Sequence, residues 1–469
     1  MQHASITPPI THNLISTNPS RNYEVLGTIP ISSEDEINHA IAQARKAFPK
    51  WKALPLEERL IYARKLRNAF VDKHERLAQL TSKEMGQTIT LARATVDRAI
   101  AYMDWSLENA PRCLAPEVSY ETEEEINELI KEPHGVGACI SPWNFPPSNF
   151  VWACYQGLIA GNTVVFKNSE EVQLFAKELE EIAHKDVDFP EGVFTIIYGD
   201  AEAAKTLVEG DIDYINFTGS TRVGQILYKK AAEKFIPVTL EMGGSDPAIV
   251  FADADLDLTI PQLYAGRFNN CGQICCSTKR LIVHEDILTK VVQKLSGILA
   301  TKQIGDALNE ETDIGPLAAK RQQKLLIEQV EDAVAKGAKI VCGGAVPEGL
   351  TGAYYEPTLL TNITPDMRVW HEEVFGPVLP IVSFSTYEEA IEKANDTIYG
   401  LGSSIFTTDK TLAAKATKDI KAGMVRVNET HYSKPENPFG GTKLSGIGRE
   451  NGKMGFDDVT YTKITAREK

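Results

Sequence analysis

The hydrophobic pattern of the first 110 residues is typical of amphipathic helices. Ser33 and Glu36 have the spacing of a capping box, which predicts a helix over 34–48. The apolar positions of this helix share one face: Ile37, Ile41, Ala44 and Phe48. A second helical pattern covers 55–85 and stops at Gly86, a residue that commonly ends helices.

From residue 135 onwards, short apolar runs alternate with segments of helical spacing. Strands are predicted over 136–140, 163–166, 193–197, 214–217 and 237–240. Helices are predicted between them, over 149–160, 169–184, 201–208 and 221–235. Repeated β-α-β units require a parallel sheet with helices on both faces. Ligands of such sheets bind at the carboxyl ends of the strands.

A second α/β region begins near Gly243. Its predicted strands are 248–251, 280–284, 339–342, 378–384, 403–406 and 424–427, and a long helix is predicted over 316–336. The polar alternating run 116–131 interrupts the first region, and the tail 457–465 has a similar pattern. We expect these two segments to pair as strands away from the core. Another subunit often covers exposed edges of this kind, which favours a homodimer or homotetramer.

Composition narrows the class of protein. A chain of 469 residues implies two or three domains, and 43% hydrophobic with 24% charged residues is typical of globular proteins. A net charge of −15 disfavours nucleic acid and membrane surfaces as partners. No apolar run reaches the roughly 18 residues of a membrane span, and the N-terminus lacks the pattern of a secretory signal. The sequence therefore predicts a soluble, cytoplasmic protein.

Seven cysteines are spaced irregularly, unlike a secreted disulfide framework. Three of them cluster at Cys271, Cys275 and Cys276. Zinc binding is the alternative interpretation of this cluster, but no second Cys/His pair follows at finger-like spacing, so no metal is predicted. A thiol on the loop at Cys275 can be a nucleophile if its pKa is lowered, although most free cysteines are inert core residues. Because neighbouring side chains on an extended loop point apart, we expect only one of Cys275 and Cys276 to face a site.

No complete G-x-G-x-x-G motif is present, so a dinucleotide site must be sought elsewhere. Gly219 and Ser220 form a strand-to-helix turn whose helix N-terminus could cradle a diphosphate, although an ordinary capped turn has the same pattern. Lys167 and Glu170 follow another strand and could hold ribose hydroxyls, with a solvated surface pair as the alternative.

Two further strand ends carry candidate catalytic groups. The rigid loop after residue 140 presents Trp143 and the Asn144 amide, and a purely structural turn is the alternative. Glu241 follows an apolar strand and precedes two glycines. Partial burial there would raise its pKa and suit it to general-base work, whereas the alternative is a salt-bridged hinge residue.

These motifs together resemble the NAD(P)-dependent aldehyde dehydrogenase family over nearly the whole chain. The matching segments are Pro142-Trp143-Asn144-Phe145-Pro146, Phe217-Thr218-Gly219-Ser220, Leu240-Glu241-Met242-Gly243-Gly244, Gly272-Gln273-Ile274-Cys275, Glu372-Glu373-Val374-Phe375-Gly376-Pro377 and Pro438-Phe439-Gly440-Gly441. The resemblance implies an α/β fold with a Rossmann-type NAD(P)-binding domain at 1–114 and 134–242. It further implies a catalytic domain at 243–440 and a strand-paired oligomerisation element at 115–133 and 441–469.

The resemblance also implies roles for individual residues. Cys275 would be the nucleophile, Asn144 the oxyanion donor and Glu241 the general base. The cofactor-binding positions would be Trp143, Lys167, Glu170, Gly219, Ser220, Glu373 and Phe375. The cofactor would be NAD, which the Glu170 carboxylate favours because it would repel a 2′-phosphate, with NADP possible.

Within the family, the segments around Asn269, Lys279 and Ser245 resemble bacterial succinate-semialdehyde dehydrogenases. Another branch of those enzymes has an arginine at the position of Asn269, where it would pair with the substrate carboxylate. That arginine is absent here, so other donors would be needed. The candidates by loop position are Arg267, His431 and Ser433. Oxidation of another small aldehyde, a thioesterase or acyltransferase activity, and a non-enzymatic binding role are the alternatives.

Overall fold

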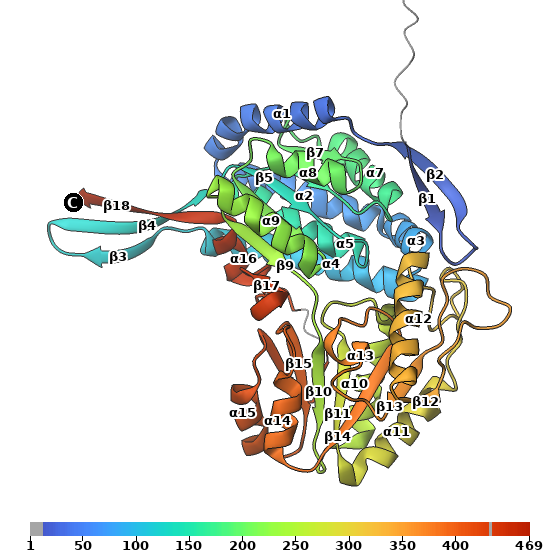
Figure 1. Ribbon diagram of the computed structural model, residues 1–469. Coiled ribbons are helices and arrows are strands. Elements are labelled where there is room, and N and C mark those ends of the chain that lie inside the picture. The colour runs from blue at the N-terminus through green and yellow to red at the C-terminus, as the bar shows by residue number, and fades with distance from the viewer. Residues whose placement is uncertain (1–12, 431–433) are drawn as a thin grey trace, which may run out of the picture.

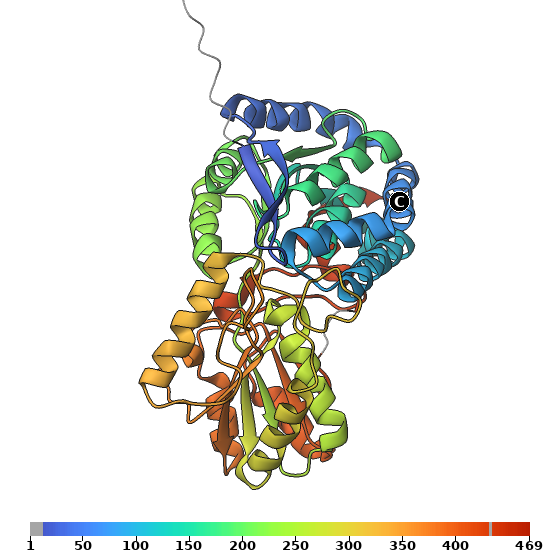
Figure 2. The same cartoon turned by 90° about the vertical axis from the view of Figure 1, so that its right-hand side faces the viewer.

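Two β-sheets covered by helices form two lobes, and a narrow three-stranded arm projects from one of them (Figure 1). This computed structural model describes residues 13–430 and 434–469. The second view shows helices on both sides of the upper sheet (Figure 2). The chain therefore has the layered α/β architecture that its alternating pattern predicts.

The first sheet has the strand order β17-β9-β8-β5-β6-β7, and β17 is antiparallel to its neighbour whereas the others are parallel. In that order the strands are Gly446–Ile447, Val238–Glu241, Tyr214–Thr218, Val136–Ile140, Thr163–Lys167 and Phe194–Ile197. The five predicted strands are confirmed within a residue. Strand order reverses between β5 and β8, where the connections diverge to opposite sides and leave a crevice for ligands.

Helices bury apolar faces against both sides of this sheet. One side is covered by α1 (Glu34–Ala53), α8 (Ala201–Glu209) and α9 (Thr221–Lys234). The other side is covered by α2 (Leu56–Asp72), α3 (His74–Met85), α4 (Ile89–Cys113), α5 (Pro146–Phe150), η1 (Val151–Tyr155), α6 (Gln156–Ala160), α7 (Gln173–Glu181) and η2 (Ile182–Val187). The capping box of α1 is confirmed, since Ser33 and Glu36 exchange side-chain and backbone hydrogen bonds.

The second sheet has the order β12-β13-β14-β11-β10-β15-β16 and is parallel except at β12. Its strands in that order are Lys339–Cys342, Thr358–Thr361, Val378–Phe384, Thr278–His284, Asp246–Val250, Gly402–Phe406 and Met424–Val427. Its helical segments are α10 (Leu256–Phe268), η3 (Asn269–Gly272), α11 (Glu285–Leu299), α12 (Lys320–Ala335), α13 (Arg368–His371), α14 (Tyr387–Asn395) and α15 (Lys410–Asp419). All six predicted strands are present, whereas β13 was not predicted.

Several local expectations are wrong. The first 110 residues are not all helical, because β1 (Asn13–Asn18) and β2 (Glu24–Pro30) form an antiparallel hairpin. The helix predicted over 55–85 is broken at Lys73, and its second part ends at Gly86 with φ 79°. The helix predicted over 149–160 contains a π-helical turn at η1. Such turns depend on tertiary packing and leave no simple periodic pattern.

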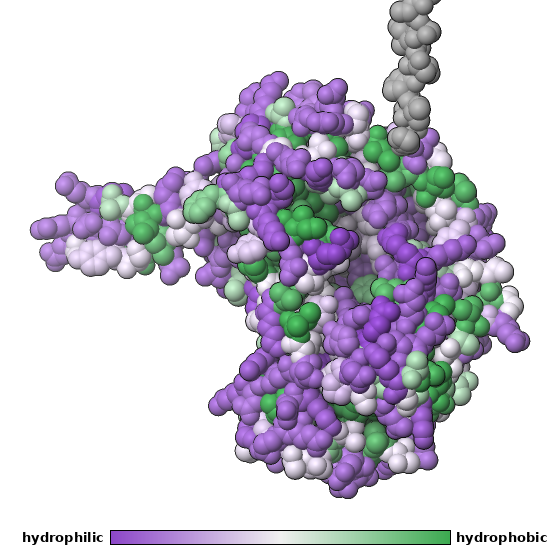
Figure 3. All heavy atoms as spheres, viewed as in Figure 1, coloured by the Kyte–Doolittle hydropathy of each residue, from purple (hydrophilic) through white to green (hydrophobic). Residues whose placement is uncertain are grey.

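The arm consists of β3 (Glu117–Glu121), β4 (Glu125–Pro133) and β18 (Thr460–Glu468), with β4 in the middle. Strand β18 reaches the arm after η4 (Lys443–Ser445), β17 and α16 (Gly452–Asp458). The expected pairing of the two excursions is confirmed along all nine residues of β18. Hydrophobic residues are exposed on the arm within a largely hydrophilic surface (Figure 3). No helix in the described part of the chain is long and apolar enough to cross a bilayer.

Candidate active site

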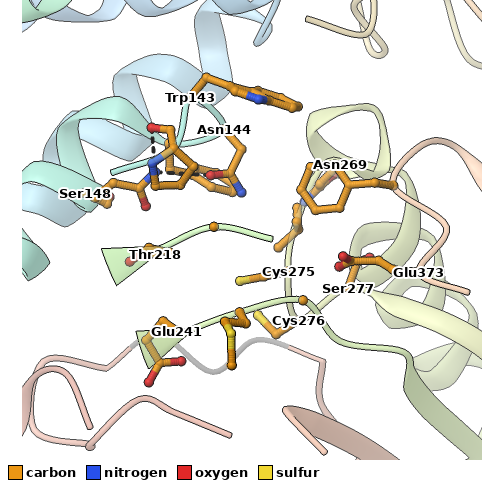
Figure 4. Close-up of a pocket in the computed structure, with 18 of the residues that line it drawn as sticks. Trp143, Asn144, Ser148, Thr218, Glu241, Asn269, Cys275, Cys276, Ser277 and Glu373 are labelled. Atoms are coloured by element: carbon orange, nitrogen blue, oxygen red, sulfur yellow. Dashed lines mark hydrogen bonds between the residues drawn. The ribbon is translucent and has the colours of Figure 1, made fainter. Parts of the chain in front are cut away.

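The carboxyl ends of the first sheet meet loops of the second lobe around a cavity of about 420 Å³ (Figure 4). Eight of the residues singled out in the sequence line it: Trp143, Asn144, Gly219, Ser220, Glu241, Cys275, Glu373 and Phe375. They come from separate strands and loops spread over more than 230 positions. The fold therefore gathers the dispersed motifs in one place.

The loop after β5 holds the Asn144 side chain in a fixed orientation. Its Nδ2 donates to the carbonyl of Gln273 at 3.1 Å, and its Oδ1 accepts from Asn149 Nδ2 at 3.1 Å. The Asn144 backbone carbonyl accepts from Asn270 Nδ2 at 3.0 Å. The second Nδ2 hydrogen has no acceptor among the described residues, so it is available at the cavity wall.

A run of left-handed residues shapes the loop that carries Cys275. Asn270, Cys271 and Gly272 have φ values of 53°, 55° and 71°. A Cβ at Gly272 would collide with the backbone of Gly376, so the two motifs fit together because this position is glycine. Gln273 is fully buried and accepts from the amide of Ala318 at 2.9 Å. The backbone before the thiol is thus rigidly held.

Cys275 and Cys276 both line the cavity, which corrects the expectation that only one would face it. The two cysteines occupy a turn in which the Ser277 amide donates a hydrogen bond to the Ile274 carbonyl at 3.2 Å. Because the backbone is not extended there, neighbouring side chains need not point apart. The hydrogen bond with Cys276, followed by burial, raises the pKa of the Cys275 thiol. The charge of Lys279 acts in the opposite direction.

Glu241 is the last residue of β9 and is only 2% exposed. Neither carboxylate oxygen has a hydrogen-bond partner among the described residues. Burial first, and then the neighbouring carboxylate of Glu450, raise the pKa of Glu241 well above its usual value. A Cβ at Gly440 would collide with the Glu241 Oε1. The carboxyl group therefore has the raised pKa expected from the sequence, and it faces the cavity without a competing donor.

The β8–α9 turn forms another wall of the cavity. Ser220 caps α9, accepting from the Val223 amide at 3.4 Å, and the amide of Gly219 donates to the Glu241 carbonyl at 2.9 Å. The N-terminus of α9 therefore opens beside Glu241, where an anion would be stabilised by the helix dipole.

The second lobe contributes Glu373 and Phe375 to the same cavity. The Phe375 ring meets the Trp143 ring edge-on at a centroid distance of 5.7 Å. Lys279, which is almost fully buried, pairs with Glu373 at 3.0 Å and also donates to the carbonyls of Ile274 and Cys275. This lysine links the motif at 372–377 to the cysteine loop. Sequence reasoning assigned it no role.

Lys167 is the last residue of β6, which lies next to β5 in the sheet, and Glu170 follows it. Neither residue lines this cavity. Lys167 is buried, which lowers its pKa, and its Nζ donates to the Asn168 carbonyl at 3.1 Å. Glu170 faces Arg321 of α12 at 3.5 Å. Both residues therefore lie at the same edge of the sheet as the cavity, but outside the set of residues that line it.

The expected role of Arg267 in substrate binding is wrong. This side chain is fully buried, donates to Ser277 Oγ at 2.9 Å and to the carbonyls of Val374 and Gly376, and does not reach the cavity. The other two candidates, His431 and Ser433, lie outside the described residues. Arg98 of α4 does line the cavity, and sequence reasoning missed it. Helical periodicity gave no indication that this face of α4 meets the site.

The profile of the aldehyde dehydrogenase family matches residues 8–465. The chain belongs to the aldehyde dehydrogenase family. It is therefore an oxidoreductase that acts on aldehydes, as the resemblance of its motifs implied. The aldehyde-dehydrogenase-like fold class predicted from the sequence is confirmed as well.

Relatives of this aldehyde dehydrogenase cover nearly its whole length. Aminoaldehyde dehydrogenase 1 of Pisum sativum, a peroxisomal protein, is 36% identical over 98% of this chain and 93% of its own. The NADP(+) succinate-semialdehyde dehydrogenase of Escherichia coli is 34% identical over 95% of this chain and 92% of its own. The crystal structure of an NAD-dependent aldehyde dehydrogenase from Sinorhizobium meliloti superimposes with a TM-score of 0.94 at 34% identity, covering 99% of this chain and 93% of that one.

Proposed function

We propose that this protein oxidises a small aldehyde to its carboxylic acid, with Cys275 as the nucleophile. The observation that carries the proposal is the convergence on one cavity of a thiol, an amide donor and a carboxyl group that has no hydrogen-bond partner in the part of the chain that the structure describes. Cys275, Asn144 and Glu241 come from three separate elements and all line that cavity. Family membership then assigns the reaction class to this arrangement.

The residues present fit a nicotinamide dinucleotide. The N-terminus of α9 at Ser220 is open to the cavity, the Glu373 carboxylate can accept from ribose hydroxyls, and Phe375 and Trp143 wall the pocket. Gly219, Lys167 and Glu170 complete the proposed set along the sheet edge. When bound, NAD(P) supplies the ring that accepts a hydride. We propose NAD as the preferred form, because the Glu170 carboxylate disfavours a 2′-phosphate.

The first chemical step uses the Cys275 sulfur. The thiol loses its proton, and the thiolate adds to the aldehyde carbon, so that one C–S bond forms and the carbonyl oxygen becomes an oxyanion. The free Asn144 Nδ2 hydrogen donates to that oxygen, together with the Cys275 backbone amide. Departure of the hydride from the thiohemiacetal carbon leaves a thioester on Cys275.

The second step is hydrolysis of this thioester, for which we propose Glu241 as the general base. Its carboxylate takes a proton from a water molecule, the hydroxide oxygen bonds to the thioester carbon, and the C–S bond breaks to release the acid. The raised pKa of Glu241 makes it a stronger base than an ordinary carboxylate. Neither oxygen has a hydrogen-bond partner within 13–430 and 434–469, which leaves both available to water.

For the substrate, we propose succinic semialdehyde, which would yield succinate. Relatives at 34% identity include enzymes named as glutarate- and succinate-semialdehyde dehydrogenases, and the motifs around Asn269 and Lys279 favour the same branch. Relatives named as aminoaldehyde and betaine aldehyde dehydrogenases match at 36% and 34% identity. Another small aliphatic aldehyde is therefore the alternative.

We also propose that the arm, from 115–133 and the tail after 441, joins subunits into a homodimer or homotetramer. Strand β3 is exposed along its whole length. Val118, Tyr120, Tyr461 and Ile464 expose 43 to 70% of their surface, more than is usual for apolar side chains. The NAD(P)-binding region 1–114 and 134–242 and the catalytic region 243–440 would contribute residues to one site in each subunit. A cytoplasmic location stays a prediction from the sequence.

The test is formation of NADH from NAD and a panel of short aldehydes, with product acids identified by mass. We expect oxidation that requires Cys275, so the Cys275→Ala protein, checked for folding, should form no NADH. The Cys276→Ala protein is the matched control and should keep most of its activity. Folded wild-type protein that forms no NADH with any aldehyde and either nicotinamide cofactor would refute the proposal.

A further inference from the structure

The charges on the cavity wall are unequally distributed. Its described lining contains two carboxylates, Glu241 and Glu373, and one basic side chain, Arg98. Glu373 is neutralised by Lys279 at 3.0 Å, and burial favours the uncharged form of Glu241. Arg98 therefore supplies the unbalanced charge of the described wall, and this charge is positive.

The position of Arg98 assigns it to the substrate side of the cavity. It lies one helical turn before Tyr102 on α4, so the two residues share a face of the helix. The Tyr102 ring meets Trp152 edge-on at 5.4 Å, and Trp152 packs against Phe439 at 5.2 Å. Phe439 and Trp152 pack in one cluster with Cys275. An aromatic wall thus connects the helix of Arg98 to the thiol.

This wall is built from other elements than the side that fits the dinucleotide. Ser220, Glu373 and Phe375 come from the β8–α9 turn and the 372–377 loop, whereas Trp152 and Phe439 come from η1 and the segment before β17. An aldehyde whose carbon lies at the Cys275 sulfur would run its chain along the aromatic side. Its distal end would then approach the part of the wall that α4 provides.

The Arg98 guanidinium is not engaged elsewhere. Within residues 13–430 and 434–469, no hydrogen bond or ion pair from Arg98 is found, although the side chain is half-buried. Its neighbour Asp97 instead faces His74 at 2.9 Å. A half-buried arginine without a partner is a ready receptor for a carboxylate, which it can bind through two parallel N–H···O bonds.

We propose that Arg98 is the specificity-determining residue that binds the distal carboxylate of a short semialdehyde acid. This inference rests on the proposed function and deepens it, because it names the class of substrate and the group that selects it. The aromatic wall contacts the methylene chain, and the fixed positive charge disfavours an aldehyde with a cationic distal group. Arg98 thus replaces the arginine that is missing at Asn269.

The experiment compares kcat/KM for succinic semialdehyde, uncharged butanal and cationic 4-aminobutanal at saturating NAD. It uses the wild type, Arg98→Gln, Arg98→Glu and Arg112→Gln. Arg112 is exposed on the same helix and does not line the cavity, so it is the matched control. Thermal unfolding of each protein confirms that it is folded.

For Arg98→Gln we expect the anionic-to-neutral ratio of kcat/KM to fall by about 10- to 100-fold, the usual range for a hydrogen bond to a charged group, mainly through KM. Arg98→Glu should lower the ratio further and raise relative activity on 4-aminobutanal. Arg112→Gln should keep the wild-type ratio. A ratio within twofold of wild type in Arg98→Gln overturns the inference, and so does a wild type without preference for the anionic aldehyde. Oxidation of no aldehyde refutes the proposed function itself.

Discussion

Substitution of Asn144 by alanine isolates the proposed oxyanion donor. The wild-type amide uses one Nδ2 hydrogen to hold the Gln273 carbonyl at 3.1 Å and presents the other to the cavity. Asn144→Ala removes both. Because the developing negative charge on the substrate oxygen needs that second hydrogen, loss of one such donor typically lowers kcat by about 100- to 1,000-fold, or roughly 2.7 to 4 kcal/mol.

The same substitution has a structural cost that must be separated from the catalytic one. Asn149 Nδ2 donates to Asn144 Oδ1 at 3.1 Å and to the Pro142 carbonyl at 3.4 Å, so it would lose one of its two acceptors. An orphaned buried donor costs roughly 1 to 3 kcal/mol of unfolding free energy. Asn149→Ala is the matched control because it breaks the same hydrogen bond, together with the longer one to the Pro142 carbonyl, and leaves the Asn144 amide in place. We expect this control to lose about 10-fold in kcat, in line with one neutral hydrogen bond that orients the donor.

The assay measures NADH formation under saturating aldehyde and NAD, with a rapid-mixing record of the first turnover. The first-turnover rate reports the step in which the oxyanion forms, so the defect of Asn144→Ala should appear there. Thermal unfolding measures the structural cost of both variants. The role of Asn144 as oxyanion donor is refuted if Asn144→Ala and Asn149→Ala lower the first-turnover rate by the same factor. It is also refuted if Asn144→Ala keeps more than a tenth of the wild-type first-turnover rate.

Three further results are expected. Cys275→Ala should abolish turnover whereas Cys276→Ala keeps most of it, and the reverse result in the NADH assay would place the nucleophile one residue later. Glu241→Gln should keep a burst of NADH but slow the steady state. Burial raises the pKa of Glu241, and only its ionised form accepts a proton, so steady turnover of the wild type should increase with pH through that raised pKa. The same increase in the pH profile of Glu241→Gln would contradict the role of Glu241 as general base. Lys279→Met should shift the alkylation of Cys275 by iodoacetamide to higher pH, because the charge of Lys279 lowers the pKa of that thiol. An unchanged pH dependence of alkylation would show that Lys279 does not lower this pKa.

Most elements of the two sheets were predictable because their patterns are local. The strand 136–140 is a run without charged residues, and the strand 280–284 contains the apolar run 281–283, as expected for strands buried on both faces. The structure places both strands at the centres of their sheets. The capping box at Ser33 and the stop at Gly86 depend on a few neighbouring residues, and both are confirmed. The hairpin of β1 and β2 was missed because its stability comes from long-range packing, such as the hydrogen bond from Ser16 to the buried Glu84 at 2.6 Å.

The candidate site was predictable to the extent that its chemistry lies in motifs. Asn144, Glu241 and Cys275 stood out in the sequence, and the structure brings them to one cavity. Arg267 was wrongly expected to bind the substrate, because a position near the cysteine loop does not determine the direction in which a long side chain points. The Arg267 side chain is fully buried. Arg98 was missed because it lies on a helix distant in the sequence from every motif.

By itself, the sequence determined the alternation of strands and helices, the family and the candidates for the reactive groups. Each of these depends on residue type and short spacing, which a linear pattern records. The tertiary structure alone decided that Cys276 shares the cavity, that Lys279 joins Glu373 to the cysteine loop, and that α4 places on the cavity wall an arginine without a partner among the described residues. These facts depend on side-chain direction and on packing between distant segments, and no short-range pattern encodes either.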